Sequence, residues 1–570
     1  MRLKVVKSKN AASLYVTKTV YDKGIERTIT VEKLGTEEVL RKKLDGGDPY
    51  EWARGYIAEL NRQEKEQIRE VLVKYSPNRE INKNEQRAYN GGYLFLAKIY
   101  YELGLDKICE KIKKKYKFEF DLNLILSRLI YGRIIYPSSK LGTYQISEKF
   151  VEQGDFELHQ IYRALEIIAK ETDLIQSELY KRSIKVTNRD TKILYYDCTN
   201  YFFEIEQEEG LKQYAKSKEN RPNPVVQMGL FLDGDGVPLA FNISDGNTNE
   251  QITLRPLETQ ILRDFELSRF VVCTDAGLSS YDNRKFNNVQ GRHFITTQSL
   301  KTLKKHVGDW ALSSNGWRCS KDGKEYDITG IDEKEHEKSF FYKETWIKEN
   351  DLEQRLIVTY SLKYRDYQRK IRNAQIERAM KAIKNNPSKL KKTTQNDYKR
   401  FITKTNVTTD GEIAETEIFN INEEKITEEV AYDGFYGICT NLEDDVFTII
   451  KATHRRWEIE ESFRIMKSEF KARPVYLKRN DRIIAHFTTC FISLMIYRLL
   501  EKKLCEKYTV HEIIRALRDM NFYRIKGEGY VPTYTRTDLT DDLHEVSGFC
   551  THFQIVSNNH MKNIFKSTKK

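Results

Sequence analysis

Five strand-like segments and one predicted helix lie between Lys192 and Gln298, and two of the strands carry an aspartate near their ends. The order of these elements strongly constrains the fold. The first runs from Lys192 to Cys198, and alternation places Ile193, Tyr195 and Asp197 on one side of it. The second begins at Arg269 and stops at Asp275, directly before Ala-Gly. The other elements are Val225–Leu232, Val237–Ile243, a helix beginning at Thr248, and Arg292–Gln298. Strands interleaved with a helix in this way predict an α/β domain.

The segment Arg455–Lys467 predicts a helix that carries charges along the border of an apolar face. At 100° per residue, Arg456, Glu460 and Lys467 fall within about 40° of one another. The apolar stripe beside them consists of Ile459, Phe463, Met466 and Phe470. Taken alone, the segment also fits an amphipathic helix with a surface charge pair. The two aspartates upstream favour a site for metal ions and phosphate groups.

Together these segments resemble a ribonuclease-H-like domain, and their motifs are similar to those of the DDE transposases of bacterial insertion sequences. The motifs are Tyr-Tyr-Asp197-Cys-Thr-Asn, Thr-Asp275-Ala-Gly, and Arg456-Trp-Glu-Ile-Glu460-Glu-Ser-Phe with Lys467. The third resembles the signature of the cut-and-paste branch, a Tyr, Arg, Glu and Lys at fixed helical spacing. Here Thr453 stands at the Tyr position. Further similar segments are Gly246–Glu250, Tyr432–Phe435, Arg473–Tyr476 and Arg482–His486.

The resemblance implies a metal-dependent enzyme that cleaves and rejoins DNA. Two Mg²⁺ (or Mn²⁺) ions about 3.5–4 Å apart can activate an attacking oxygen and stabilise a leaving oxygen, and carboxylates are their preferred ligands. Asp197 is expected to bridge both ions, while Asp275 and Glu460 each hold one. Arg456 and Lys467 are expected to bind DNA phosphates. The family further implies a homodimer in the synaptic complex, terminal inverted repeats and target DNA as partners, and hairpin ends as intermediates.

Other acidic residues fit structural roles better. Glu461 lies about 140° around the helix from Arg456 and is expected to face solvent. Asp233 and Asp235, in an Asp-Gly-Asp-Gly run between two strands, predict a hairpin turn. Asp245 and Glu250 lie near a helix start, where capping suffices as an explanation, although the resemblance leaves open a secondary role for Glu250. The sequence has no glycine-rich phosphate loop ending in Lys-Ser/Thr, which excludes an ATP-driven transposition helper.

The positive charge is local. The chain has a formal net charge of +12, and residues 361–403 contain thirteen Lys or Arg against three acids. A solvated helix is one interpretation of this run, and contact with the DNA backbone is the favoured one. The run Lys111–Lys117 is a second candidate for DNA contact.

Composition narrows the class of protein and its compartment. A hydrophobic content of 39% excludes a disordered protein. Eight scattered cysteines without a C-x-x-C pair predict reduced, mostly buried thiols of a cytoplasmic protein. The resemblance to transposases implies that this protein is bacterial and associated with the nucleoid. The apolar stretch Ile483–Leu500 contains His486 and Arg498 and predicts a buried helix, not a membrane span.

The predicted organisation is a ribonuclease-H-like core with a β-rich insertion domain and α-rich terminal regions. The expected divisions are 1–80, strands and a charged helix; 81–190, a helical region that binds DNA; 191–300, the first part of the core; 301–434, the insertion with its basic helix; 435–505, the second part of the core; and 506–570, a helical tail. Two alternatives stay open. One is a domesticated or inactive transposase that only binds DNA, and the other is a ribonuclease-H-like nuclease.

Overall fold

The structure, a computed structural model, describes residues 1–8, 11–22, 25–44, 47–68, 71–73, 75–215, 221–385, 397–407 and 416–570. The chain divides into two compact units. Unit 1 comprises residues 1–89, 522–533 and 551–564, and unit 2 comprises residues 90–521, 534–550 and 565–570. All predicted site residues belong to unit 2.

Unit 1 begins with strands and a helix, in the order that the sequence predicts. The strands β1 (Arg2–Lys7), β2 (Ala12–Asp22) and β3 (Ile25–Thr36) form an antiparallel sheet. The helices α1 (Glu37–Lys43) and α2 (Pro49–Ile68) follow it. Leu14, Leu40 and Ala53 form their small buried core.

Unit 2 opens with the helices expected for residues 81–190. They are α3 (Tyr93–Glu102), α4 (Leu105–Lys115), α5 (Leu122–Ile135), α6 (Lys140–Ser147), α7 (Leu158–Lys170) and α8 (Thr172–Val186). In the predicted basic run, Lys111 pairs with Glu178 at 2.8 Å and Lys115 with Glu171 at 2.7 Å. Part of that charge therefore holds helices together and is not available to a partner.

Ten strands of the described residues form one mixed sheet in unit 2, in the order β11-β10-β12-β13-β16-β9-β8-β5-β6-β7. The strands are β5 (Ile193–Phe202), β6 (Val225–Asp233), β7 (Pro238–Asp245), β8 (Phe270–Thr274), β9 (Arg292–Gln298), β10 (Trp317–Cys319), β11 (Glu325–Tyr326), β12 (Phe340–Glu349), β13 (Leu352–Ser361) and β16 (Phe435–Thr440). β5 is antiparallel to β6 and parallel to β8. This large mixed sheet and the helices around it confirm the predicted α/β class.

Two predicted boundaries in this region are wrong. β5 does not end at Cys198 but continues to Phe202, because its pairing with β6 extends from Leu194 to Phe202. The helix α9 (Glu250–Asp264) begins two residues later than expected, since the Asn249 side chain accepts the Gln251 N–H and caps it. The helix packs its buried leucines and isoleucine against β5, β6 and β8.

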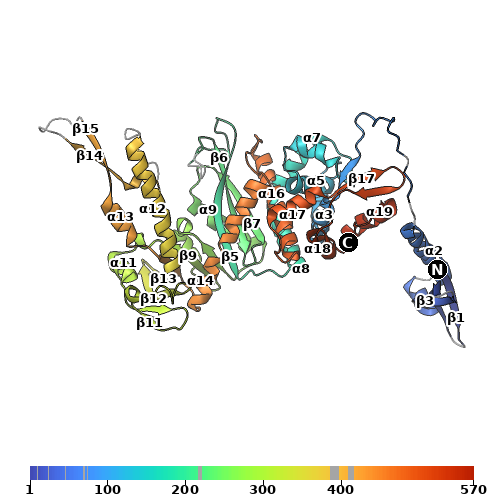
Figure 1. The fold of residues 1–570 in the computed structure, drawn as a ribbon, viewed down its shortest axis with the longest axis horizontal. Helices are drawn as coiled ribbons and strands as arrows, with labels where there is room; N and C mark the ends of the chain where they lie inside the picture. The colour runs from blue at the N-terminus through green and yellow to red at the C-terminus, as the bar shows by residue number, and fades with distance from the viewer. Residues whose placement is uncertain are drawn as a thin grey trace. The chain divides into compact units, whose positions relative to one another are not determined.

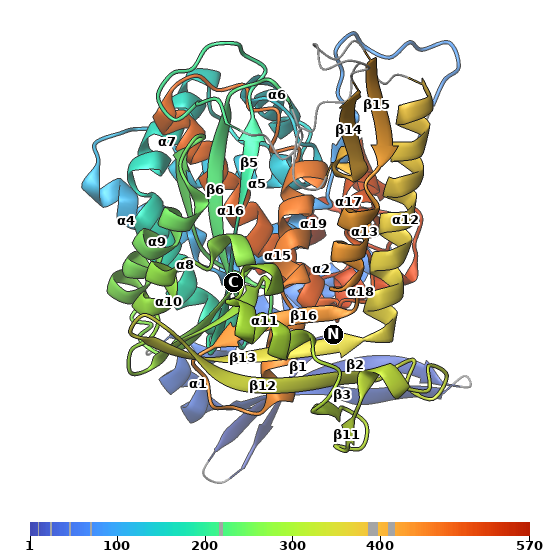
Figure 2. The ribbon, with the colours of Figure 1, turned by 90° about the vertical axis from the view of Figure 1, so that its left-hand side faces the viewer.

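The first four strands of residues 301–434 do not form a separate sheet. β12 and β13 pair with each other, and β13 pairs with β16, so four strands of residues 301–434 extend the sheet that contains β5. The basic helix α12 (Leu362–Asn385) and α13 (Glu423–Val430) lie beside the hairpin of β14 (Ile402–Val407) and β15 (Thr416–Ile421) (Figure 2). Residues 386–396 of the predicted basic run lie outside the described residues.

The helix predicted from Arg455 to Lys467 is interrupted. α14 (Val446–His454) ends before it, Arg455 and Arg456 form a turn, and α15 runs from Trp457 to Arg464. A π-helical turn, Ile465–Glu469, follows directly, with the Phe470 N–H donating to the Ile465 carbonyl at 3.0 Å. The predicted apolar stripe is confirmed, since Ile459, Phe463, Met466 and Phe470 are all buried.

The helix α16 (Asn480–Lys503) is the central helix of unit 2. It lies between β7 and the helices α5 and α7 (Figure 1). It is long and apolar enough to cross a membrane, but 94% of its most apolar window is buried inside the protein. The prediction of a buried helix is therefore confirmed.

Arg498 of α16 holds α15 in place. Its guanidinium donates to the Ser462 hydroxyl at 3.0 Å and to the Glu458 carbonyl at 3.3 Å, both in α15. It also pairs with Glu501 at 2.6 Å, which balances its charge in a buried setting. A long apolar helix thus fixes the position of the short helix that carries Glu460.

The C-terminal region is not the purely helical tail that the sequence predicts. α17 (Val510–Asp519), α18 (Asp538–Ser547) and α19 (Asn558–Thr568) alternate with three strands. These strands are β17 (Asn521–Ile525), β18 (Gly529–Pro532) and β19 (Val556–Ser557), and they join β4 (Ala88–Asn90) in a four-stranded sheet. The strands are two to five residues long, which is too short for a clear periodicity in the sequence.

Replacing Arg498 with Met should destabilise the protein by about 3–5 kcal/mol. The buried Ser462 hydroxyl and Glu458 carbonyl would lose their donor, and the half-buried Glu501 would lose its cationic partner. Urea unfolding followed by tryptophan fluorescence measures this free energy. The matched control is Arg464→Met on α15. Arg464 is exposed, and its partner Glu461 also lies near Arg498, so this pair should contribute less than about 1 kcal/mol. Equal losses for both variants would contradict the anchoring role of Arg498.

Candidate active site

Asp197 and Asp275 emerge from adjacent parallel strands. The register of β5 and β8 pairs Tyr195 with Cys273, and the two aspartates follow two residues further along their strands. Because alternate residues share a face of a strand, both aspartates follow the side of the sheet that Tyr195 and Cys273 share. Neighbouring strands lie about 4.8 Å apart, so this register brings the two acidic positions together.

The backbone around Asp275 is held in place by its own side chain and by the next strand. The Asp275 carboxylate accepts the Leu278 N–H at 3.1 Å and caps the 3₁₀ turn Ala276–Leu278. The Thr296 hydroxyl of β9 donates to the Asp275 carbonyl at 3.2 Å. These contacts end β8 at a defined place and leave the second carboxylate oxygen of Asp275 for other partners.

One cavity of about 310 Å³ brings together three of the predicted residues, Asp197, Glu460 and Lys467. Its other lining residues are Cys198, Thr199, Phe463, Arg464, Ser468 and Arg473. Glu460 is exposed and Asp197 is half-buried, so solvent and ligands can reach both carboxylates. The cavity forms because α15 packs against β5 through its apolar stripe and leaves its charged border at the rim.

Lys467 places its ammonium over the strand that carries Asp197. Its Nζ donates to the Thr199 hydroxyl at 2.5 Å and lies 5.5 Å from the centre of the Tyr201 ring. A uniform helix was expected to bring Lys467 onto the face of Glu460. The π-helical turn changes the rotation per residue, yet both side chains line the same cavity.

Arg456 does not line this cavity. It lies in the turn before α15, and its Nη1 donates to the Thr297 hydroxyl of β9 at 3.3 Å. The structure therefore places Arg456 on the β9 side of the site and Lys467 on the β5 side.

Thr453 faces the interior of the protein. It is buried at the end of α14, and its hydroxyl donates to the Ile449 carbonyl at 3.0 Å. The residue at the Tyr position of the family signature is therefore engaged within its own helix.

The rival carboxylates have structural partners. Asp233 is fully buried and pairs with Arg189 at 2.6 Å, which confirms the hairpin-turn interpretation of the Asp-Gly-Asp-Gly run. Asp235 accepts the Asp190 N–H at 2.9 Å. Glu461 is not simply solvated, since it pairs with Arg464 at 2.9 Å and lies 3.5 Å from Arg498.

Two further residues of this region, Glu458 and Arg473, were not predicted as site residues, and Arg473 lines the cavity of Asp197. Glu458 pairs with Arg455 at 2.8 Å, and burial raises the pKa of its carboxyl. It packs against Gly236, where a Cβ atom would lie 1.7 Å from its Oε2. Gly236 has a φ of +73°, so a glycine is required there both by conformation and by space. The run Trp-Glu-Ile-Glu-Glu contains three acids, Glu458, Glu460 and Glu461. Their different roles follow from how each one packs.

The two cysteines next to the aspartates are buried thiols, as predicted. Burial raises the pKa of Cys198 and of Cys273 to about 12. A thiol is a strong metal ligand only when it is deprotonated, so neither residue suits that role. Among the described residues, no group of three or more His, Cys, Asp or Glu side chains is arranged to hold a metal ion.

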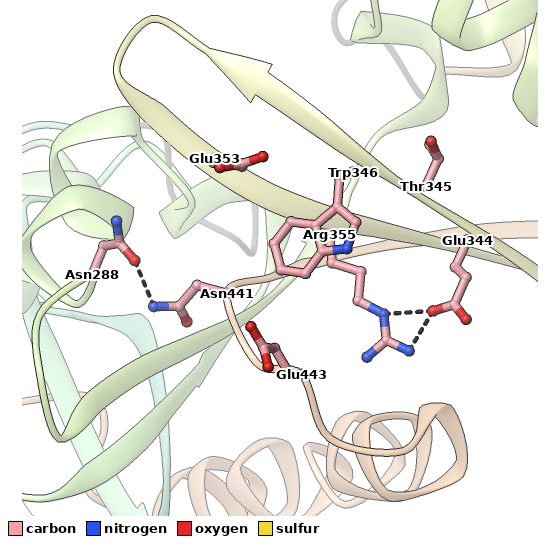
Figure 3. A pocket seen from close by; sticks show the side chains of 8 residues that line it. All are labelled: Asn288, Glu344, Thr345, Trp346, Glu353, Arg355, Asn441 and Glu443. Atoms are coloured by element: carbon pink, nitrogen blue, oxygen red, sulfur yellow. Dashed lines mark hydrogen bonds and ion pairs between the residues drawn. The ribbon is translucent and has the colours of Figure 1, made fainter.

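The largest cavity described is elsewhere in the sheet and contains none of the predicted site residues. It measures about 820 Å³ and lies along β12, β13 and the segment that follows β16 (Figure 3). Its Arg355 pairs with Glu344 and donates to the Asp444 carbonyl at 2.6 Å. With Glu353 and Glu443 also on its wall, this cavity does not suit an anionic substrate.

Among solved structures, the chain is similar to a piggyBac transposase synaptic complex with hairpin DNA, determined by cryo-EM. The identity is 8% and the TM-score 0.36, and the match covers 85% of this chain and 88% of that one. A similarity at this level is too weak to assign a function. No curated protein matches the chain.

The family model described as "Transposase DDE domain" matches residues 202–496. The matched segment contains Asp275, Arg456, Glu460 and Lys467, and it begins five residues after Asp197. Because the match covers more than half of the 570 residues, the chain belongs to the family of transposases with a DDE domain.

Proposed function

We propose that this protein is the DNA transposase of a bacterial insertion sequence, and that it cuts DNA at the element ends and joins them to target DNA. Asp197, Asp275 and Glu460 are the proposed catalytic carboxylates. The observation that carries the proposal is the cavity shared by Asp197, Glu460 and Lys467, which combines carboxylates with a cation at hydrogen-bond distance from the strand of Asp197. A phosphodiester needs both kinds of group around it.

The strand order supports a ribonuclease-H-like core. The strands β7, β6 and β5 form an antiparallel meander, and β8 and β9 continue the sheet in parallel with β5. In this arrangement one acid lies on the central strand and the second on its parallel neighbour. The third acid, Glu460, lies on α15, which follows a long insertion in the chain. The proposed core therefore consists of β5–β9, α9 and α15.

We further propose that the three carboxylates hold divalent cations, Mg²⁺ or Mn²⁺. The three side chains supply hard carboxylate oxygens, which are the ligands that Mg²⁺ prefers. Asp197 and Glu460 already share a cavity, and Asp275 occupies the matching position on the next strand. Since the three are not gathered into one metal-binding group, the side chains of Asp275 and Glu460 have to turn toward Asp197. When bound, two such ions would activate the attacking oxygen and stabilise the leaving one.

The exposed face of α12 is a proposed contact for the DNA backbone. Several cations of the predicted basic run are engaged within the protein, because Arg372 pairs with Asp433 at 2.5 Å and Arg400 with Glu429 at 2.8 Å. A second set is exposed and forms no ion pair with the described residues: Lys363, Lys370, Arg378, Lys381 and Lys384. This second set is the part of the run that can reach a phosphate backbone.

Replacement of the carboxylates should abolish DNA cleavage. Asp197→Asn, Asp275→Asn and Glu460→Gln should each lower the rate by more than about 100-fold, because even residues behind metal ligands contribute about 10–100-fold. The substrate is a DNA duplex that contains the sequence flanking the gene of this protein. Chelation with EDTA should stop the reaction, and added Mg²⁺ should restore it. The control is Glu461→Gln, one residue from Glu460, which should still cleave. Normal nicking by the Asp197→Asn variant would refute the assignment.

The products and the assembly should follow the cut-and-paste scheme. We expect two chains to hold two element ends, and light scattering should then report a complex of two chains with two DNA ends. Denaturing gels should show a double-length strand from hairpin ends, and Arg456→Ala should reduce it by about 10–100-fold, since a charged hydrogen bond contributes about 1.5–3 kcal/mol. Complete cleavage by one chain on one end, or linear breaks without hairpins, would contradict these expectations.

Neutralising the exposed face of α12 should weaken DNA binding without regard to sequence. The variant combines Lys370→Gln, Arg378→Gln, Lys381→Gln and Lys384→Gln. Each lost phosphate contact should reduce the slope of log affinity against log salt by about 0.9. The control is Glu377→Gln on the same helix, which removes an exposed acid and should strengthen binding slightly. An unchanged slope in the fourfold variant would assign these residues to a solvated surface.

A further inference from the structure

A second cavity lies beside the catalytic one and is lined by cations without any carboxylate. It measures about 360 Å³, and we call it the Lys140 pocket. Its basic residues are Arg133, Lys140, Lys471, Arg473 and His486. The remaining residues of its wall are prolines, hydroxyl-bearing residues and aliphatic residues, and none of them is acidic.

Lys140 is the feature that most needs an explanation. Its side chain is only 5% exposed, and no acceptor or carboxylate of the described residues pairs with its ammonium. Burial and the nearby Arg133 lower the pKa of Lys140 to about 7. A buried ammonium without a partner carries a large desolvation cost, which proteins normally avoid by pairing. Because the residue lines a cavity, an anion that enters can supply the missing partner.

The groups around Lys140 add to the positive potential. Arg133, itself 5% exposed, donates to the Phe470 carbonyl at 3.0 Å and to the Ser138 carbonyl at 3.3 Å, and it has no carboxylate partner among the described residues. Burial, together with Arg133 and Lys140, lowers the pKa of His486 well below its usual value, so the imidazole is neutral. Lys140 and Arg133 thus face the pocket without a carboxylate of the described residues to balance their charge.

The pocket is linked to the catalytic strand. Arg473 lines both cavities. Two residues later, the Val475 N–H donates to the Phe202 carbonyl at 3.1 Å, at the end of the strand that carries Asp197. The first turn of α6 also borders the pocket through Ser139 and Lys140, which adds the positive end of a helix to its wall.

We propose that the Lys140 pocket binds a backbone phosphate of the DNA strand that occupies the catalytic cavity. The proposal rests on the proposed function, because it takes DNA as the ligand. The ammonium of Lys140 and the guanidinium of Arg133 hold the phosphate. The Tyr476 ring, which is 69% exposed on the wall of the pocket, offers a face on which a base can stack. Inorganic phosphate shares the chemistry of the phosphate group but not the base.

The test compares the unchanged full chain with Lys140→Met, which keeps the apolar part of the side chain and removes the charge. The probes are a fluorescent single strand of about 16 nucleotides, measured by anisotropy, and inorganic phosphate, measured by the shift in melting temperature. Lys140→Met should weaken DNA binding by about 10–100-fold. It should reduce the salt slope by about 0.7 and abolish the stabilisation by phosphate. Its own melting temperature should be equal to or higher than that of the unchanged chain, since an unpaired buried charge is removed.

Two further variants separate the alternatives. Lys149→Met removes an exposed lysine just after α6 and should leave both measurements unchanged. Tyr476→Ala should weaken binding of the single strand but not of phosphate. If Lys140→Met affects phosphate only, the pocket holds a free anion and the assignment to DNA is overturned. A fall in its melting temperature with unchanged DNA affinity makes Lys140 a structural residue and also overturns the proposal. If the Lys140→Met variant still cleaves DNA normally, the proposed function stands whatever the result for the pocket. If the unchanged chain binds no DNA, the proposed function itself fails.

Discussion

The packing of α15 against β5 is the contact on which the candidate active site depends. Ile459, Phe463 and Met466 are buried between this helix and the sheet, and Arg498 of α16 holds the helix from the other side through Ser462 and the Glu458 carbonyl. Buried apolar area contributes about 25 cal/mol per Å², so a short helix can be held firmly at the sheet. Glu460 reaches the cavity of Asp197 only because this contact sets the rotation of α15.

The charges of unit 2 fall into two groups with different physical roles. Buried pairs such as Arg189–Asp233 and Arg372–Asp433 hold turns and helices in place, and each cation there is balanced by a carboxylate at 2.5–2.6 Å. Lys140 and the exposed lysines of α12 have no such balance among the described residues. A positive net charge of +12 does not distinguish these groups, because the charge of a residue says nothing about its partner. The unbalanced group is the one available to a polyanion.

The strand and helix periods predicted much of the local structure. β9 has the predicted bounds, and β6 begins at the predicted residue. The apolar stripe of α15 is buried as the helical period requires. The errors have local causes. The break at Arg455–Arg456 and the π-helical turn after Arg464 interrupt a sequence whose apolar spacing fits one continuous helix. Short strands β17–β19 have too few residues for their alternation to be distinguished from a loop.

The sequence by itself determined the two aspartate-bearing strands, the amphipathic face with Glu460, and the similarity to DDE transposases, because these features depend on residues close together in the chain. Only the tertiary structure decided which of them meet. It joined the strands of residues 301–434 to the same sheet as β5, directed Arg456 toward Thr297 and away from the cavity, and buried Thr453. It also brought Arg133, Lys140 and Lys471 around one pocket. Contacts between residues hundreds of positions apart follow from strand pairing and side-chain packing, which local periodicity does not encode.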